Sequence, residues 1–181
     1  MNKRITICVC TLAVILSGYS VSAQSSLTQL PFGIVIGQTT NEEIEDRGTC
    51  VNQVQESDGK TRCEQYNIAG NFTVFSSQNE VVNKVSFDEA DGNQLPRKWQ
   101  ELGLEFGGQN SSGTLEIDFR NIIKANGASY INTSILSLEK EVEGILFKFD
   151  IDKLRYEATV ITSSVKSSKL GLRNITITEA Y

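Results

Sequence analysis

Catalysis by this chain would have to rely on few residue types, because histidine is absent. None of the 181 residues is a histidine, which excludes Ser-His-Asp and Cys-His catalysis and any metal site supported by an imidazole. An enzyme built on this sequence would therefore need carboxylate, lysine or tyrosine chemistry.

One segment matches a pattern for serine nucleophiles. Ser163-Ser164-Val165-Lys166 has the S-x-x-K spacing, in which a lysine one helical turn away can activate the serine. The companion elements S-D-N and K-T-G are absent, and 163–170 is rich in serine and lysine, a composition typical of a loop. We interpret this segment as a solvated polar connection.

Paired carboxylates occur at Asp88 and Asp91 and at Asp150 and Asp152. Either pair could belong to a glycosidase site or bind calcium. Aspartates beside glycine or lysine are also common in turns, which is the interpretation we prefer, and the sequence lacks a full calcium-loop pattern. We therefore predict no catalytic residue, no cofactor, no metal ligand and no enzymatic activity.

The first 23 residues have the features of a secretory signal peptide. Lys3 and Arg4 give a basic start, 5–16 is apolar, and small residues precede a predicted cleavage before Gln24. The apolar stretch is too short to span a membrane, and no segment of spanning length follows it. We predict a periplasmic or secreted protein.

Cys50 and Cys63 remain after removal of this peptide, which contains Cys8 and Cys10. Oxidation is the default in an exported chain, so we expect a disulfide between Cys50 and Cys63. The alternatives are a metal pair and a redox motif. The spacing fits neither a C-x-x-C site nor half of a zinc site, and no histidine is present to complete one.

The mature chain is acidic. Removing Lys3 and Arg4 from 17 basic residues leaves 15 against 22 acidic residues over 158 positions, a net charge near −7. Such a chain repels phosphate backbones, so we do not expect a nucleic acid as its partner. It also has no polybasic patch for anionic lipid.

The elements that would position these residues are organised around 31–48, PFGIVIGQTTNEEIEDRG. A short apolar run between Gly33 and Gly37 is followed by two threonines and two glutamates at the spacing of a helix-capping box. Gly48 is expected to end that short helix, because glycine tolerates left-handed geometry.

A shorter version of this pattern returns at a constant offset of 70, from 33 to 103 and from 37 to 107, as GLEFG. Thr114 is then expected to cap an amphipathic helix that ends at Gly127. The apolar stripe of this helix consists of Leu115, Phe119, Ile122 and Ile123. The repeat predicts two copies of one small unit.

The predicted fold is α+β, with two similar helix-plus-antiparallel-sheet units in tandem. Strand candidates are 51–56, 61–66, 71–76, 81–87, 143–149, 154–161 and 173–178. The predicted divisions are the signal peptide 1–23, a flexible N-terminus 24–30, a first unit with the disulfide 31–90, a linker with a short helix 91–102, and a second unit 103–181.

Trp99, Phe106, Phe119 and Tyr130 could form an exposed aromatic surface for a protein partner. Phe119 belongs to the helix stripe and is expected in the core. Trp99 lies at the junction of the two units, where it either plugs the junction or contacts a partner. Trp99 and Tyr130 are therefore our candidate partner-contact residues.

The motif residues, given twice in an exported chain with a cysteine loop, resemble the beta-lactamase inhibitory protein-like fold group, which includes related envelope assembly proteins. They are Gly33, Gly37, Gln38, Thr39, Gly48, Cys50, Cys63, Gly103, Gly107 and Gly127. The resemblance spans 31–178 and implies helices packed on antiparallel sheet and activity by binding proteins rather than by catalysis. Two departures are that the second unit has no cysteine and that no cysteine is placed for lipidation.

We hypothesise an exported protein-binding module, such as a periplasmic enzyme inhibitor or a toxin-immunity protein. The alternative is a soluble envelope-maintenance protein that binds a cell-wall or lipid component. The first function requires a broad sheet surface, whereas the second requires a lined apolar cavity.

Overall fold

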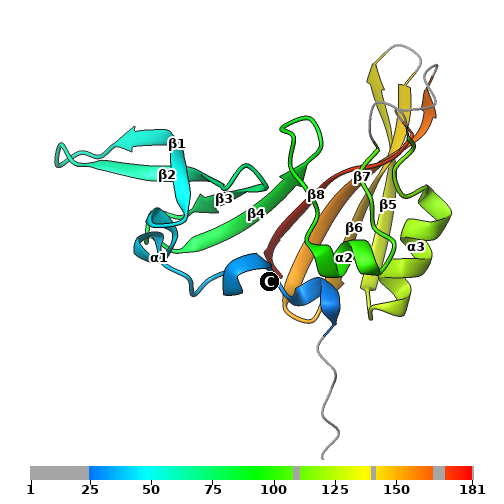
Figure 1. The fold of residues 1–181 in the computed structure, drawn as a ribbon, viewed down its shortest axis with the longest axis horizontal. Coiled ribbons are helices and arrows are strands. Elements are labelled where there is room, and N and C mark those ends of the chain that lie inside the picture. The colour runs from blue at the N-terminus through cyan, green and yellow to red at the C-terminus, as the bar shows by residue number, and fades with distance from the viewer. Residues whose placement is uncertain (1–24, 108–110, 140–141, 165–169, 181) are drawn as a thin grey trace, which may run out of the picture.

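A computed structural model describes residues 25–107, 111–139, 142–164 and 170–180, which form one sheet with helices against it (Figure 1). The helices are η1 (Ser26–Thr28), η2 (Pro31–Gly33), α1 (Asn41–Glu45), α2 (Arg97–Glu101) and α3 (Glu116–Ala125). The strands are β1 (Gly48–Gln55), β2 (Thr61–Ile68), β3 (Phe72–Ser76), β4 (Val82–Asp88), β5 (Ser129–Glu139), β6 (Val142–Ile151), β7 (Leu154–Ser164) and β8 (Gly171–Glu179).

The sheet is continuous and antiparallel, with the strand order β1-β2-β3-β4-β8-β7-β6-β5. β4 pairs with β8 from Lys84 opposite Thr178 to Asp88 opposite Asn174, so two four-stranded meanders share one ladder. The predicted α+β class with two units in tandem is wrong, because strand makes up 48% and helix 18% of the described residues, and the sheet is one body. Joining the meanders removes the free edges that β4 and β8 would otherwise present.

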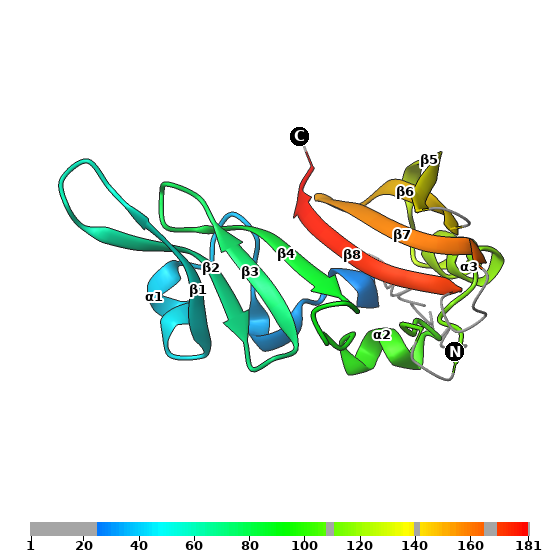
Figure 2. The same cartoon turned by 90° about the horizontal axis from the view of Figure 1, so that it is seen from above.

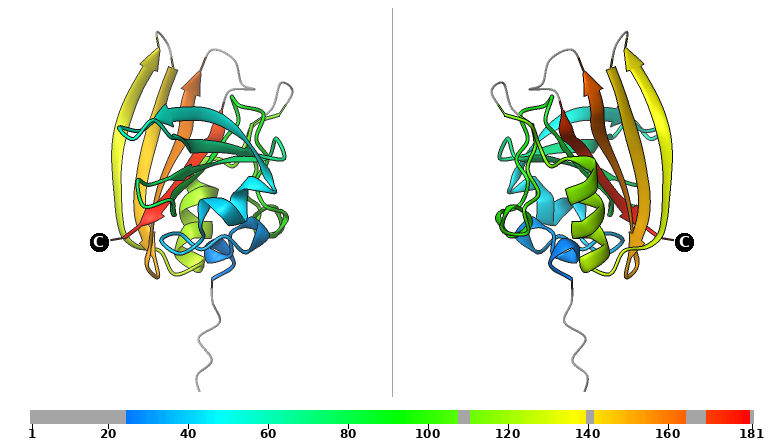
Figure 3. Two further views of the ribbon diagram at one scale, coloured as in Figure 1. Left: turned by 90° about the vertical axis from the view of Figure 1, so that its left-hand side faces the viewer. Right: turned by 90° about the vertical axis from the view of Figure 1, so that its right-hand side faces the viewer.

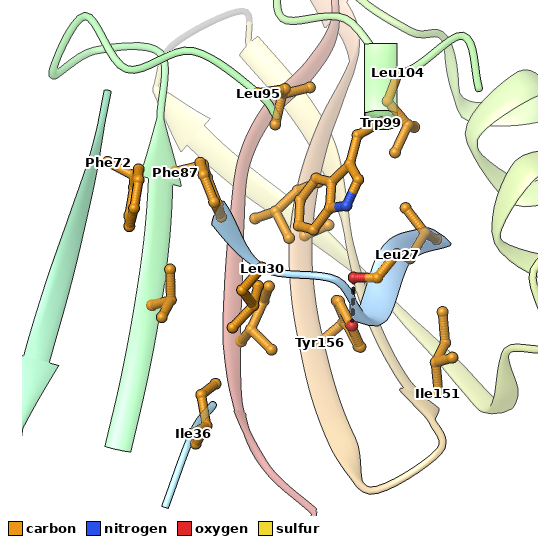
Figure 4. Close-up of a cluster of buried hydrophobic side chains, with 14 of the residues drawn as sticks. Leu27, Leu30, Ile36, Phe72, Phe87, Leu95, Trp99, Leu104, Ile151 and Tyr156 are labelled. Carbon is orange, nitrogen blue, oxygen red and sulfur yellow. Dashed lines mark hydrogen bonds between the residues drawn. The ribbon is translucent and has the colours of Figure 1, made fainter. Parts of the chain in front are cut away.

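The N-terminal segment crosses the covered face of this joint. The Tyr156 hydroxyl on β7 donates to the Leu27 carbonyl at 2.9 Å, and Gly37 N–H donates to the Val82 carbonyl at the start of β4 at 2.7 Å. The chain between them therefore passes over β8, and Leu27 and Leu30 are buried there (Figure 4). Leu27 and Leu30 thus tie the segment 25–30 to the core, in place of the flexible N-terminus that we expected.

The predicted linker 91–102 also packs into the core. Leu95 is buried and Trp99, on α2, is 0% exposed. The Trp99 ring lies 5.1 Å from that of Phe87, and its indole N–H donates to the Ser26 carbonyl at 3.2 Å. This segment thus seals the covered side of the β4–β8 joint together with the N-terminal segment (Figure 4).

The helix predicted from the apolar stripe is α3, and its buried side chains are Phe119 and Ile123. Phe119 packs edge-on against Phe147 on β6, with 5.0 Å between ring centroids. Thr114 does not cap this helix, contrary to the prediction. Its hydroxyl accepts from the Glu105 N–H and donates to the Gly103 carbonyl, so it fixes the preceding turn instead.

The two glycine motifs make matching contacts with the sheet. Gly37 N–H binds the first residue of β4, and Gly107 N–H donates to the Leu172 carbonyl near the start of β8 at 3.3 Å. Thr40 caps α1 through the predicted capping box with Glu43. Gly48 does not end this helix; it begins β1, where a Cβ atom would lie 2.5 Å from the Ile68 side chain.

The predicted disulfide between Cys50 and Cys63 is formed, with 5.9 Å between the Cα atoms. Cys50 lies opposite Tyr66 and Cys63 opposite Gln53, so the cysteines are not partners in register. The ladder is irregular on either side of Asn52. Because a bulge bends its strand, this irregularity accompanies the offset cross-link between β1 and β2.

Replacing Tyr156 by Phe is expected to lower the free energy of unfolding by about 1–2 kcal/mol, because the Leu27 carbonyl would lose a buried donor. Urea denaturation followed by the fluorescence of Trp99, the single tryptophan, measures this change. The matched control is Tyr130→Phe, since Tyr130 is 86% exposed. Equal stability of Tyr156→Phe and the wild type would show that this bond does not anchor the N-terminal segment.

The double variant Cys50→Ser, Cys63→Ser is expected to lose about 3 kcal/mol of stability, because the cross-link limits the freedom of the unfolded chain. The same denaturation experiment measures the loss, with each single variant as a control for the side-chain change. A double variant as stable as the oxidised wild type would contradict this expectation.

Candidate functional site: the uncovered face of the sheet

The helices and the N-terminal segment lie on one side of the sheet, which leaves the other side uncovered (Figures 2 and 3). Strand side chains alternate between these two sides. Those pointing to the helices are mostly apolar and buried, such as Val85, Ile177 and Ala158. We call the opposite side the uncovered face.

One polar row crosses the uncovered face from edge to edge. Its successive partners are Thr49, Asn67, Thr73, Ser86, Thr176, Glu157, Lys148 and Asn132, of which Thr73 is buried. At the centre the Ser86 and Thr176 hydroxyls bond to each other at 3.2 Å, across the β4–β8 joint. Lys148 and Glu157 form an ion pair beside them at 2.6 Å. The row thus combines short hydroxyl and amide groups with one paired charge.

A second row carries more charge. It contains Asn52, Gln65, Phe75, Lys84, Thr178, Arg155, Asp150 and Ser129. Arg155 binds Asp150 through two nitrogens at 3.0 and 3.2 Å, and this partner raises the pKa of Arg155. The Lys84 ammonium lies 3.6 Å from the centroid of the Phe75 ring. Cations on this row are therefore held by an aspartate or an aromatic ring.

An open hollow of about 1010 Å³ lies at one end of the second row. Gln65, Phe75, Lys84, Thr178 and Glu179 line it, together with the turn between β3 and β4. Its groups are an aromatic ring, an amide and charges of both signs. Such a lining can accept a polar side chain or a sugar more readily than a lipid tail.

The residues singled out for possible catalysis or metal binding have other partners or positions where the structure describes them. No group of cysteine, aspartate and glutamate side chains there is placed to hold a metal ion. The Asp88 carboxylate accepts a hydrogen bond from the Ala90 N–H in a turn, which is the role preferred from the sequence. The Asp150 carboxylate forms an ion pair with Arg155. Ser163 and Ser164 end β7, and Lys166 lies outside the described residues.

The candidate contact residues Trp99 and Tyr130 lie apart. Trp99 is in the core beside Phe87 and offers no surface to a partner. Of the two roles considered for Trp99, its position fits the one in which it fills the junction. Tyr130 is on β5 with a φ of 51°, an unusual conformation for a bulky residue, at an irregularity of the β5–β6 ladder. Its side chain projects into solvent.

Sequence reasoning missed the uncovered face as a site. The signal was present in the alternate Ser, Thr, Asn and Gln residues of the strand candidates. Those residues indicate a solvated side for each strand. They do not indicate that eight such sides form one surface, because the alignment of the strands is set by pairing.

Asp88→Asn is expected to stabilise the protein near neutral pH. Burial raises the pKa of the Asp88 carboxyl, the Ala90 N–H opposes this, and Asp91 and Glu89 raise the pKa further. An acid with a raised pKa in the folded state lowers stability when it ionises, and this loss disappears below its unfolded pKa of about 3.9.

The stability difference between Asp88→Asn and the wild type should therefore shrink as the pH falls from about 7 to about 3.9, measured by denaturation at each pH. The control Asp91→Asn should give a smaller gain in stability, because it removes only the repulsion between the Asp91 and Asp88 carboxylates. A gain for Asp88→Asn that does not change with pH would contradict the stated cause.

None of the helices in the described part of the chain is long and apolar enough to cross a membrane. Comparison with protein-family models, curated protein sequences and solved structures found no match.

Proposed function

We propose that this protein is an exported protein-binding module whose uncovered face receives the partner. The observation that carries the proposal is the continuous ladder from β1 to β5 through the β4–β8 joint. Without that joint, each meander would offer a surface half as wide.

The size of the uncovered face suits a protein partner. Adjacent strands lie about 4.8 Å apart and residues within a strand about 3.3 Å apart, so eight strands of about seven residues cover roughly 800 Å². A stable protein–protein interface buries about 800 Å² on each partner. The face is therefore about as large as one side of a standard interface.

The chemistry of the face suits recognition. Its central groups are hydroxyls already bonded to each other, as in Ser86 and Thr176, beside the ion pair of Lys148 and Glu157. Paired groups of this kind are preorganised and lose little side-chain freedom on binding. Phe75 adds an aromatic ring, which is a common anchor at interfaces.

The proposed location is the periplasm or the exterior of the cell. The disulfide supports this location, because disulfides persist in oxidising compartments. An acidic surface with a broad polar face fits an inhibitor of an exported enzyme or an immunity protein against an imported toxin. The resemblance to the beta-lactamase inhibitory protein-like group, drawn from the motif residues, supports the same function.

A second candidate is a soluble envelope-maintenance protein that binds a cell-wall component. The observation that favours it is the hollow beside Phe75 and Gln65, where an aromatic ring and an amide lie together. The polar lining favours a glycan over a lipid. The hollow is one part of the uncovered face, so the first candidate uses more of the surface.

Thr176→Arg is expected to weaken partner binding by about tenfold or more, because a long side chain at the centre of the face would hold the two surfaces apart. The substitution removes the bond between the Ser86 and Thr176 hydroxyls, so urea denaturation must first show that the variant is folded. Asn121→Arg on the exposed side of α3 is the matched control.

The measurement is affinity capture by the mature, oxidised protein from an extract of its own cells, followed by mass spectrometry and titration of the captured protein. A stoichiometric protein that binds the wild type and Asn121→Arg but not Thr176→Arg supports the proposal. Capture that Thr176→Arg leaves unchanged excludes the uncovered face. Binding of purified cell-wall glycan that is lost in Phe75→Ala favours the second candidate.

A further inference from the structure

β5 is a free edge of the sheet. It is the last strand in the order and is hydrogen-bonded to β6 on one side. Its register is unbroken from Asn132 opposite Lys148 to Ser137 opposite Glu143. Alternate backbone N–H and C=O groups along this stretch point away from the sheet, in the geometry that another strand needs for pairing.

The edge at β1 differs in its regularity. Its ladder with β2 is irregular on both sides of Asn52, and the disulfide from Cys50 ties it to β2. Bulges and constraints of this kind make an edge strand a poor template for a further strand. The two ends of the sheet are therefore not equivalent.

β5 lacks the side chains that usually protect an edge. From Ser129 to Leu138 it contains no charged residue and no proline, whereas edge strands of monomeric proteins commonly carry lysine, proline or a central bulge. Tyr130 is 86% exposed, Ile135 is 84% exposed, and Leu138 is also exposed. Three large apolar side chains thus project from one strand.

Ile135 has this exposure for a structural reason. It lies opposite Ile145 on β6, and so on the side of the sheet that the helices cover. The described helix nearest in sequence, α3, packs over β7 and β8 and reaches β6 through Phe119. Ile135 is thus an inward-facing residue beyond the reach of the layer that would bury it.

We propose that the β5 edge pairs with the β5 edge of a second copy of this chain. The two strands run antiparallel about a two-fold axis and extend the sheet from eight strands to sixteen. An antiparallel pair of identical strands is self-complementary, because each copy offers the same donors and acceptors to the other. The geometry also brings the exposed apolar side chains of the two β5 strands together.

The β5 edge is a place where two acidic copies can meet without bringing like charges together. The mature chain has a net charge near −7, so two copies repel each other over most of their surfaces. The stretch from Ser129 to Leu138 adds no like charges to that repulsion. A charged partner, in contrast, would find no complementary group on it.

The size of the contact sets the expected strength. The six residues of regular register, Asn132 to Ser137, cover roughly 20 Å by 10 Å on each copy, which is well below the area of a standard interface. The dimer should therefore be weak and should depend on concentration. The β5 edge and the uncovered face are different surfaces, so this proposal does not rest on the identity of the proposed partner.

The test is sedimentation equilibrium of the mature, oxidised protein from about 1 µM to about 1 mM. The wild type is expected to shift from monomer to dimer over this range. Ile135→Lys should weaken self-association by about tenfold or more, because it puts a like charge on each copy within the short contact. The matched control Val51→Lys, at an exposed apolar residue of the β1 edge, should behave as the wild type.

A second measurement locates the contact. Amide hydrogen exchange of the peptide 129–139 should slow as the protein is concentrated, while exchange of 48–55 should not change. If Ile135→Lys does not fold, Thr133→Lys on the same exposed strand replaces it. A monomer at every concentration, equal dimerisation by Ile135→Lys, or loss of dimer only in Val51→Lys would overturn the proposal.

Discussion

The pairing of β4 with β8 is the interaction on which the rest of the structure depends. It joins residues such as Ser86 and Thr176, which are 90 positions apart in the chain. On one side of this ladder, Val85 and Phe87 lie opposite Ile177 and Ile175 and form the centre of the core. On the other side, the same pairing aligns the polar rows into one surface. The core and the uncovered face are therefore two consequences of one ladder.

The covered side of this ladder is closed by segments with little regular structure of their own. α2 is five residues long, and helices this short are not stable alone in water. Trp99 and Tyr156 hold the N-terminal segment through bonds to the carbonyls of Ser26 and Leu27. These bonds satisfy backbone groups that burial would otherwise leave without partners. Short irregular segments can thus replace a helical layer where buried polar side chains bind their backbone.

Local features could be predicted from the sequence, and the arrangement of the strands could not. The capping box of Thr40 and Glu43 and the burial of Phe119 depend on residues close in the chain, and both are present. Thr114 has the spacing of a helix cap, but its hydroxyl binds the backbone of the preceding turn. The polar side of each strand in the candidate site could be recognised from the alternation within that strand. Their alignment into rows follows from the β4–β8 pairing, which period-two alternation does not specify.

The position of β8 has a consequence for how the chain acquires its structure. β8 is the last of the described strands along the chain, yet it lies in the middle of the sheet between β4 and β7. A nascent chain that has not reached Gly171 contains two meanders with no ladder between them, and the contacts that join them are distant in sequence. Such contacts form late and make folding slow. The two meanders therefore have no ladder between them until β8 is available, and the covered core and the uncovered face form only when β4 and β8 meet.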